Sequence, residues 1–155
     1  MSGFDRAIHM PSEENPGVRL LRFGFIVSVD QLVKYAVSKG AIPAEIDPQS
    51  PLFNATGKYE SCCLLRKATG WVLLDFADGY PLIPPNRNKY FLLLEMFNNR
   101  VMDSVLKAHR LTEAHMNSTI EYISKELAPF ADDDKWVNEA LWWRDRPSLR
   151  ALSWM

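Results

Sequence analysis

The sequence predicts an α+β fold in which helices pack on a small, mostly antiparallel sheet. Apolar residues recur at every second position over 18–27, which is typical of a strand with one buried face. They recur at spacings of three and four over 28–39 and 112–128, as in amphipathic helices. Turn residues separate short apolar runs between 59 and 83, which favours short strands joined by tight turns.

A single domain is expected, because 155 residues of which 47% are hydrophobic can bury one substantial core. Residues 1–17 hold Pro11, Pro16 and Gly17 without apolar periodicity, so they are predicted to form an extended or mobile N-terminal arm. Residues 18–155 then form the globular domain, and its C-terminal segment 136–155 is rich in aromatic residues.

The first strand leads directly into the first helix. The predicted strand 18–27 is followed by Ser28 and Gln31, whose spacing matches a capping box at the start of a helix. The predicted helix 28–39 ends at Gly40, which can adopt the left-handed conformation common after a helix.

The middle of the chain is predicted to be a long loop followed by a hairpin. Residues 41–58 contain three prolines and no sustained period. Strands near 59–67 and 71–77 are expected to flank a short turn that contains Gly70. The Asp78-Gly79 turn allows a further strand at 80–83.

The remainder of the chain is predicted to be helical, with helices near 88–108, 112–128 and 133–144. For residues 90–97 a strand that ends in an asparagine turn is the alternative, because Asn98 and Asn99 interrupt the helical pattern. The predicted core combines residues of the strands and the helices: Leu32, Val33, Phe23, Phe25, Val72, Leu74 and Leu94.

Charge and composition argue against several functional classes. The net charge is only −1, so the basic surface that nucleic acid requires is not expected. The N-terminal residues do not resemble a secretory signal, and the longest apolar run, 91–94, is far too short to cross a membrane. The adjacent Cys62 and Cys63 favour free thiols over a disulfide. A cytoplasmic or nuclear protein is therefore expected.

The sequence offers weak candidates for catalysis. Cys63 could act as a nucleophile if the fold brought it to His109 or His115. Asp75 and Asp78 could act as an acid and a base, although their position near a predicted turn favours a structural role over a catalytic one. The spacing of cysteines, histidines and carboxylates matches no metal site, and the scattered glycines match no phosphate loop, so no metal or cofactor is expected.

The most informative local feature is the C-terminal segment, which holds four of the five tryptophans. Tryptophan and arginine are enriched at binding hot spots. The candidate partner-binding residues are Trp142, Trp143, Arg144, Arg146 and Trp154.

Two functions are therefore considered. The first is a protein-interaction module or homo-oligomer that uses the segment 136–155. The alternative is a small enzyme or small-molecule-binding protein, with a pocket between the sheet and the helices and loop 41–58 at its rim.

Overall fold

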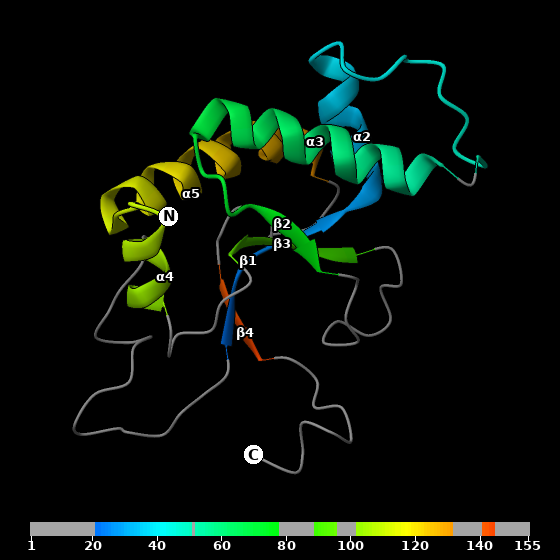
Figure 1. Cartoon of the computed structure of the whole chain (residues 1–155). Helices are drawn as coiled ribbons and strands as arrows, with labels where there is room; N and C mark the ends of the chain where they lie inside the picture. Colours follow the sequence, from blue (N-terminus) through cyan, green and yellow to red (C-terminus); the bar gives the residue numbers. More distant parts are fainter. Residues whose placement is uncertain (1–20, 51, 78–88, 96–101, 132–140, 145–155) are drawn as a thin grey trace.

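The computed structural model describes residues 21–50, 52–77, 89–95, 102–131 and 141–144 (Figure 1). These residues form helices and an antiparallel sheet, so the mixed class is correct in outline, although several segments differ in type from the prediction. The elements are, in chain order, β1 (Leu21–Ser28), α2 (Val29–Ser38), α3 (Phe53–Thr69), β2 (Asp75–Ala77), β3 (Lys89–Glu95), α4 (Met102–Ala108), α5 (Glu113–Leu127), the 3₁₀ turn η1 (Ala128–Phe130) and β4 (Leu141–Arg144).

The four strands pair in the order β2-β3-β1-β4. All three pairings are antiparallel; Phe25 of β1 pairs with Leu92 of β3, and Phe76 of β2 pairs with the same residue from the other side. Helices α2, α3 and α5 lie together on one side of this sheet (Figure 1). The core fills the space between that helical layer and the strands.

The capping box at the start of α2 is confirmed. The Ser28 hydroxyl accepts a hydrogen bond from the Gln31 backbone N–H at 3.2 Å, and the Gln31 side-chain oxygen accepts one from the Ser28 N–H at 2.8 Å. Two donors that a helix start leaves unpaired are thereby satisfied. The strand 18–27 is confirmed from Leu21 onward, and α2 occupies the predicted range 28–39.

The predicted strand 59–67 is wrong, because these residues belong to helix α3. Gly70 follows the helix with a φ of 70°, so it is a left-handed helix cap and not a hairpin turn. The buried positions of α3 recur at helical spacing. They are Phe53, Gly57, Ser61, Cys62 and Leu65. Of the second predicted strand, 71–77, only Asp75–Ala77 is a strand, and 80–83 lies outside the described residues.

The predicted helix 88–108 is also wrong over its first half, where the alternative holds and Lys89–Glu95 forms β3. Strand β3 pairs with both β1 and β2, and these two pairings favour a strand over the helix that the apolar spacing also fits. Only Met102–Ala108 is helical in this range. Helix α5 occupies the predicted range 112–128, with Thr112 as its N-cap.

The predicted helix 133–144 is contradicted at its end. Residues Leu141–Arg144 form β4, which pairs with the first half of β1; the rest of the range lies outside the described residues. Backbone hydrogen bonds to β1 decide the conformation here, and no local pattern in the sequence reports them.

The predicted core is confirmed in part. Phe25, Leu32 and Leu74 are fully buried in the main cluster, whereas Val33 belongs to a second, smaller cluster with Val29 and Phe53. Val72 is 60% exposed, so its placement in the core was wrong. The side chains of Phe23 and Leu94 lie outside the described set. No helix in the described ranges has the length and apolarity to span a bilayer.

Candidate functional site

An open apolar groove of about 490 Å³ lies beside α2, between this helix, the loop 41–52 and the start of α3. We call it the α2 groove. It is lined by Asp30, Val33, Lys34, Val37, Ser38, Ala44, Ile46, Pro48, Phe53 and Phe130.

The helical period explains why α2 contributes half of this lining. Each of residues 33, 34, 37 and 38 lies three or four positions after an earlier member of the set that begins at residue 30, so all five share one face of the helix. The opposite face carries Leu32, Tyr35 and Ala36 into the core. Helix α2 therefore has two apolar stripes, one for the core and one for the groove.

The loop forms the other wall and is held by its own turns. The Ile46 N–H donates to the Pro43 carbonyl at 3.2 Å, and the Ser50 N–H donates to the Asp47 carbonyl at 3.0 Å. The Asp47 carboxylate also accepts from the Gln49 N–H at 2.9 Å. These bonds fix the backbone on both sides of Ile46, whose side chain contacts the groove floor.

The floor of the α2 groove is a small hydrophobic cluster. Val33 and Phe53 are buried in it, and Val37 and Ile46 pack on them while remaining half-buried. Phe130 closes one side and meets the Tyr35 ring edge-on at 6.3 Å. Half-buried apolar side chains that face a concave surface can bury further area against a ligand.

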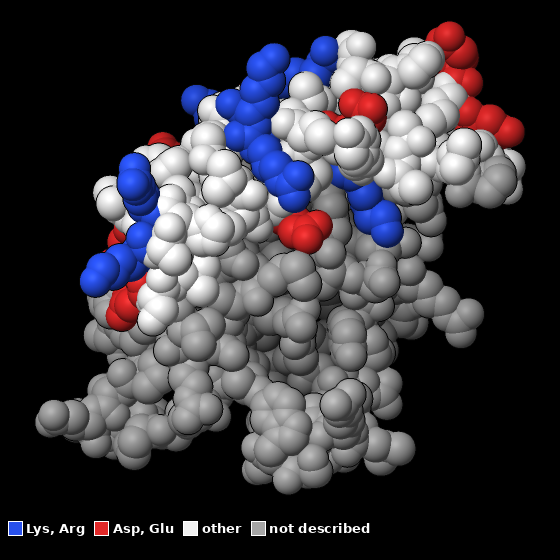
Figure 2. Space-filling model, in the orientation of Figure 1, with Lys and Arg blue, Asp and Glu red and all other residues white. Residues whose placement is uncertain are grey.

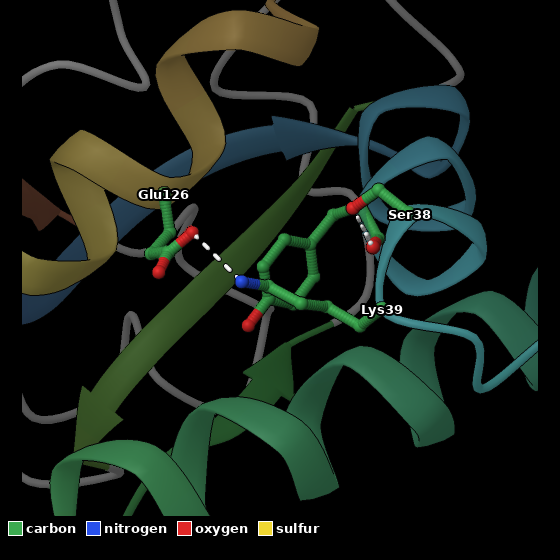
Figure 3. A network of polar contacts seen from close by, with 4 residues as sticks. Ser38, Lys39 and Glu126 are labelled. Atoms are coloured by element: carbon green, nitrogen blue, oxygen red, sulfur yellow. Dashed lines mark hydrogen bonds and ion pairs between the residues drawn. The ribbon is translucent and has the colours of Figure 1, made fainter.

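Polar contacts hold the C-terminal end of α2 in place (Figure 3). The Lys39 ammonium lies 3.4 Å from the Glu126 carboxylate of α5 and 5.8 Å from the centre of the Tyr35 ring. The Ser38 hydroxyl donates to the Tyr35 carbonyl at 2.6 Å. Burial, with Tyr122 and Glu126 nearby, raises the pKa of the Tyr35 hydroxyl well above its usual value. Tyr35 therefore stays neutral and packs behind the groove.

The charged residues that line the groove are Asp30 and Lys34, one of each sign, and further acidic side chains are exposed on the neighbouring loop. Asp30 is exposed in the first turn of α2, and the exposed Glu45 and Asp47 flank Ile46 in the loop. Lys34 is the positive residue among the lining side chains. Figure 2 shows the acidic side chains gathered at the upper right, where the loop lies in Figure 1. The groove therefore has an apolar floor and balanced charges in its lining, beside a loop that exposes acidic side chains.

The lining residues offer mainly apolar contact surface. They include no cysteine and no histidine. Within the described residues there is also no group of three histidine, cysteine or carboxylate side chains that could hold a metal ion. The arrangement can bind an apolar group, and the one hydroxyl in its lining, that of Ser38, donates to the Tyr35 carbonyl.

The candidate nucleophile Cys63 does not meet its proposed histidine partners. It is half-buried on α3 and shares a side-chain hydrogen bond with Tyr59, one turn earlier. His115 contacts the last residue of α3, where its Nε2 lies 2.7 Å from the Thr69 carbonyl oxygen. Six residues of α3 separate Cys63 from Thr69, which is about 9 Å along the helix axis. His109 is exposed just after α4.

The carboxylate pair is not brought to the groove either. Asp75 is half-buried in β2, and Asp78 lies outside the described residues. Burial raises the pKa of the Cys62 thiol from 9.0 to about 11, and the nearby Asp75 carboxylate contributes to this increase. The Cys62 thiol donates to the Leu74 carbonyl at 3.3 Å, and Arg66 donates to the same oxygen at 2.7 Å. This cysteine has a packing role at the junction of α3 and β2.

The partner-binding candidates fall at the opposite edge of the sheet. Trp142, Trp143 and Arg144 belong to β4, where their backbones pair with Phe23, Arg22 and Leu21. Arg146 and Trp154 lie outside the described residues. The role of the segment 136–155 in binding therefore stays a prediction.

The α2 groove is not the pocket that the sequence predicted. The predicted loop 41–58 is wrong over 53–58, which begin helix α3, and the loop residues that line the groove are Ala44, Ile46 and Pro48. The groove lies against the outer face of α2, however, and not between the sheet and the helices. The signal that could have located it is the valine series Val29, Val33 and Val37, which is a second apolar stripe on a short helix.

Comparison with protein family models, with curated proteins and with solved structures finds no match for this chain.

Proposed function

We propose that this chain is a binding protein, and that the α2 groove receives an apolar ligand or the apolar side chains of a partner. The observation that carries the proposal is the apolar floor formed by Val33, Val37, Ile46 and Phe53, which is open to solvent. A volume of about 490 Å³ falls within the range of ligand pockets in proteins.

Binding is favoured over catalysis by the chemistry of the lining. The ionisable side chains in it are Asp30 and Lys34, and both are exposed at the rim. General acid and base groups are normally tuned by burial inside a cleft. The candidates with reactive side chains, Cys63 and His115, contact other parts of the fold.

The proposal is tested with Nile red, a neutral dye whose fluorescence rises in apolar surroundings. Ile46→Asp places a charge on the groove wall and should lower the affinity for the dye at least about tenfold, because a buried unpaired carboxylate is costly. Val72→Asp is the matched control, since Val72 is 60% exposed and lies beyond the far end of α3. The control should bind the dye like the unmodified chain.

Circular dichroism and the midpoint of unfolding show whether each variant is folded. Equal dye binding by a folded Ile46→Asp variant and by the control would contradict the proposal. Loss of binding in both variants would place the dye site elsewhere and contradict it equally.

A further inference from the structure

We infer that the ligand of the α2 groove is a small uncharged apolar molecule, and not a second copy of this chain or another protein. The inference rests on the proposed function, because it names the ligand of the same groove. It is carried by the charge balance of the lining, by the hydrogen bonds that its polar groups already make, by its extent and by the contacts that hold its walls.

The charges in the described lining of the groove cancel. Asp30 and Lys34 lie one turn apart on the groove face of α2, and both are exposed. Lys34 already has an interaction partner of its own. A ligand with a single charge would be attracted by one of these side chains and repelled by the other, so its charge gains little from the groove. The lining therefore favours a ligand without net charge.

The other polar groups of the described lining are engaged within the protein. The Ser38 hydroxyl donates to the Tyr35 carbonyl at 2.6 Å. On the loop side, the Ile46 N–H donates to the Pro43 carbonyl at 3.2 Å, and Pro48 has no N–H to offer. A polar group that is buried without a hydrogen bond costs free energy. The groove therefore selects for a ligand with little polar surface.

The groove is small for a protein partner. Ten described residues line it, whereas each side of a standard protein interface contributes about 20–30 residues and buries about 800 Å². Val33 and Phe53, at the floor, are only 6% and 8% exposed, so they have little area left for a broad interface. A molecule that enters the concave volume of about 490 Å³ can still contact these side chains.

The walls of the groove are held by contacts within the protein. The loop is fixed by its own turns, and Phe130 meets the ring of the buried Tyr35 edge-on. The end of α2 beyond Tyr35 is tied to α5 by the ion pair of Lys39 and Glu126 (Figure 3). Small-molecule sites are usually preformed in this way, because a site that is already ordered loses less entropy on binding.

The inference is tested with three probes that share an octyl chain and differ in the head group: 1-octanol, octanoate and octylammonium. Each displaces Nile red from the unmodified chain at neutral pH, below its micelle concentration. 1-Octanol should act at the lowest concentration. The two ions should need about three- to tenfold more, because a charged head loses water against a lining that has no net charge to offer it. An ion that acts at a lower concentration than 1-octanol would overturn the inference.

Two variants test the charge balance directly. Asp30→Asn should favour octanoate over octylammonium by about threefold in dilute salt, and Lys34→Gln should favour octylammonium to the same extent. Both preferences should shrink at high salt, where charges are screened. Glu121→Gln is the matched control, because Glu121 is exposed on α5, and its ratio should equal that of the unmodified chain. An unchanged ratio in both groove variants would overturn the inference.

Sedimentation velocity distinguishes a small ligand from a second copy of the chain. The unmodified protein should sediment equally fast with and without 1-octanol, because the groove takes no part in association. An assembly that 1-octanol dissociates, and that the Ile46→Asp variant does not form, would mean that a second copy occupies the groove. That result would overturn the inference.

The dye separates failure of this inference from failure of the proposed function. If Nile red binding depends on Ile46 but an ion displaces the dye better than 1-octanol, or no probe displaces it, the inference fails and the proposed function stands. If folded Ile46→Asp and Val72→Asp variants bind the dye equally well, both fail.

Discussion

Gly57 of α3 lies against Val33 of α2 so closely that a Cβ atom built on Gly57 would come within 2.6 Å of the Val33 Cγ2 atom. Real Cβ atoms do not approach other carbon atoms this closely, so only glycine fits between the two helices at this point. Val33 also forms the floor of the α2 groove. The close approach of α2 and α3 therefore sets the position of that floor.

Gly57→Ala should lower the free energy of unfolding by about 1–3 kcal/mol, because the added methyl group overpacks the contact with Val33. In an exposed helix position the same change would raise stability by roughly 0.5–1 kcal/mol, so the sign of the effect reports the packing. Urea denaturation measures it.

Val33→Ala provides the matching test through a double-mutant cycle. The double variant should be more stable than the sum of the two single effects predicts, because the smaller side chain gives the new methyl group room. A coupling energy of about 0.5 kcal/mol or more is expected, and strictly additive effects would contradict the close contact.

Leu74→Ala and Val72→Ala should differ strongly although the residues are two apart. Leu74 is fully buried, so its truncation should cost about 2–5 kcal/mol, whereas Val72 is 60% exposed and its truncation should change stability by less than about 0.5 kcal/mol. Thermal unfolding of the two variants makes the comparison. Equal losses would mean that the turn after α3 is assigned incorrectly.

The free energy of unfolding should fall at alkaline pH, because the Cys62 thiol ionises more easily in the unfolded chain than in the folded one. Burial raises the pKa of its thiol from 9.0 to about 11. Below pH 9 the thiol is protonated in both states, and between pH 9 and 11 the unfolded chain alone releases the proton. The stabilisation is therefore present below pH 9 and is lost as the pH rises to 11.

The comparison with Cys62→Ala isolates this contribution, because the other titrating groups are common to both chains. The stability advantage of the unmodified chain should shrink by about 2–3 kcal/mol between pH 8.5 and 11, at about 1.4 kcal/mol for each pKa unit. Denaturant titrations across this range measure it, and a constant advantage would rule out a buried neutral thiol.

The sequence correctly placed the helix starts that are fixed by hydrogen bonds between residues close together in the chain. The capping box of Ser28 and Gln31 placed the start of α2, and Thr112 lies at the start of α5 as the apolar spacing indicated. In both cases the interacting atoms are three residues apart. Short-range hydrogen bonds of this kind are fully encoded in a short stretch of sequence.

The errors fall where distant contacts decide the conformation. Lys89–Glu95 has a spacing that fits a helix, yet it pairs with β1 and β2, which lie far from it in the sequence. Gly70 fits both a hairpin turn and a helix cap, and the buried stripe of α3 determines which one forms. The α2 groove was not predicted for the same reason, because the face of α2 that meets the loop depends on contacts between residues far apart in the sequence.

The most direct test of the α2 groove is a methyl NMR titration of the unmodified chain with Nile red. The chain contains seven isoleucines, and three described ones report on known places: Ile46 on the groove wall, and Ile120 and Ile123 in the core. We predict that the Ile46 methyl signal shifts progressively with dye while the signals of Ile120 and Ile123 stay in place. A dye that binds without moving the Ile46 signal would contradict the assignment of the groove as the binding site.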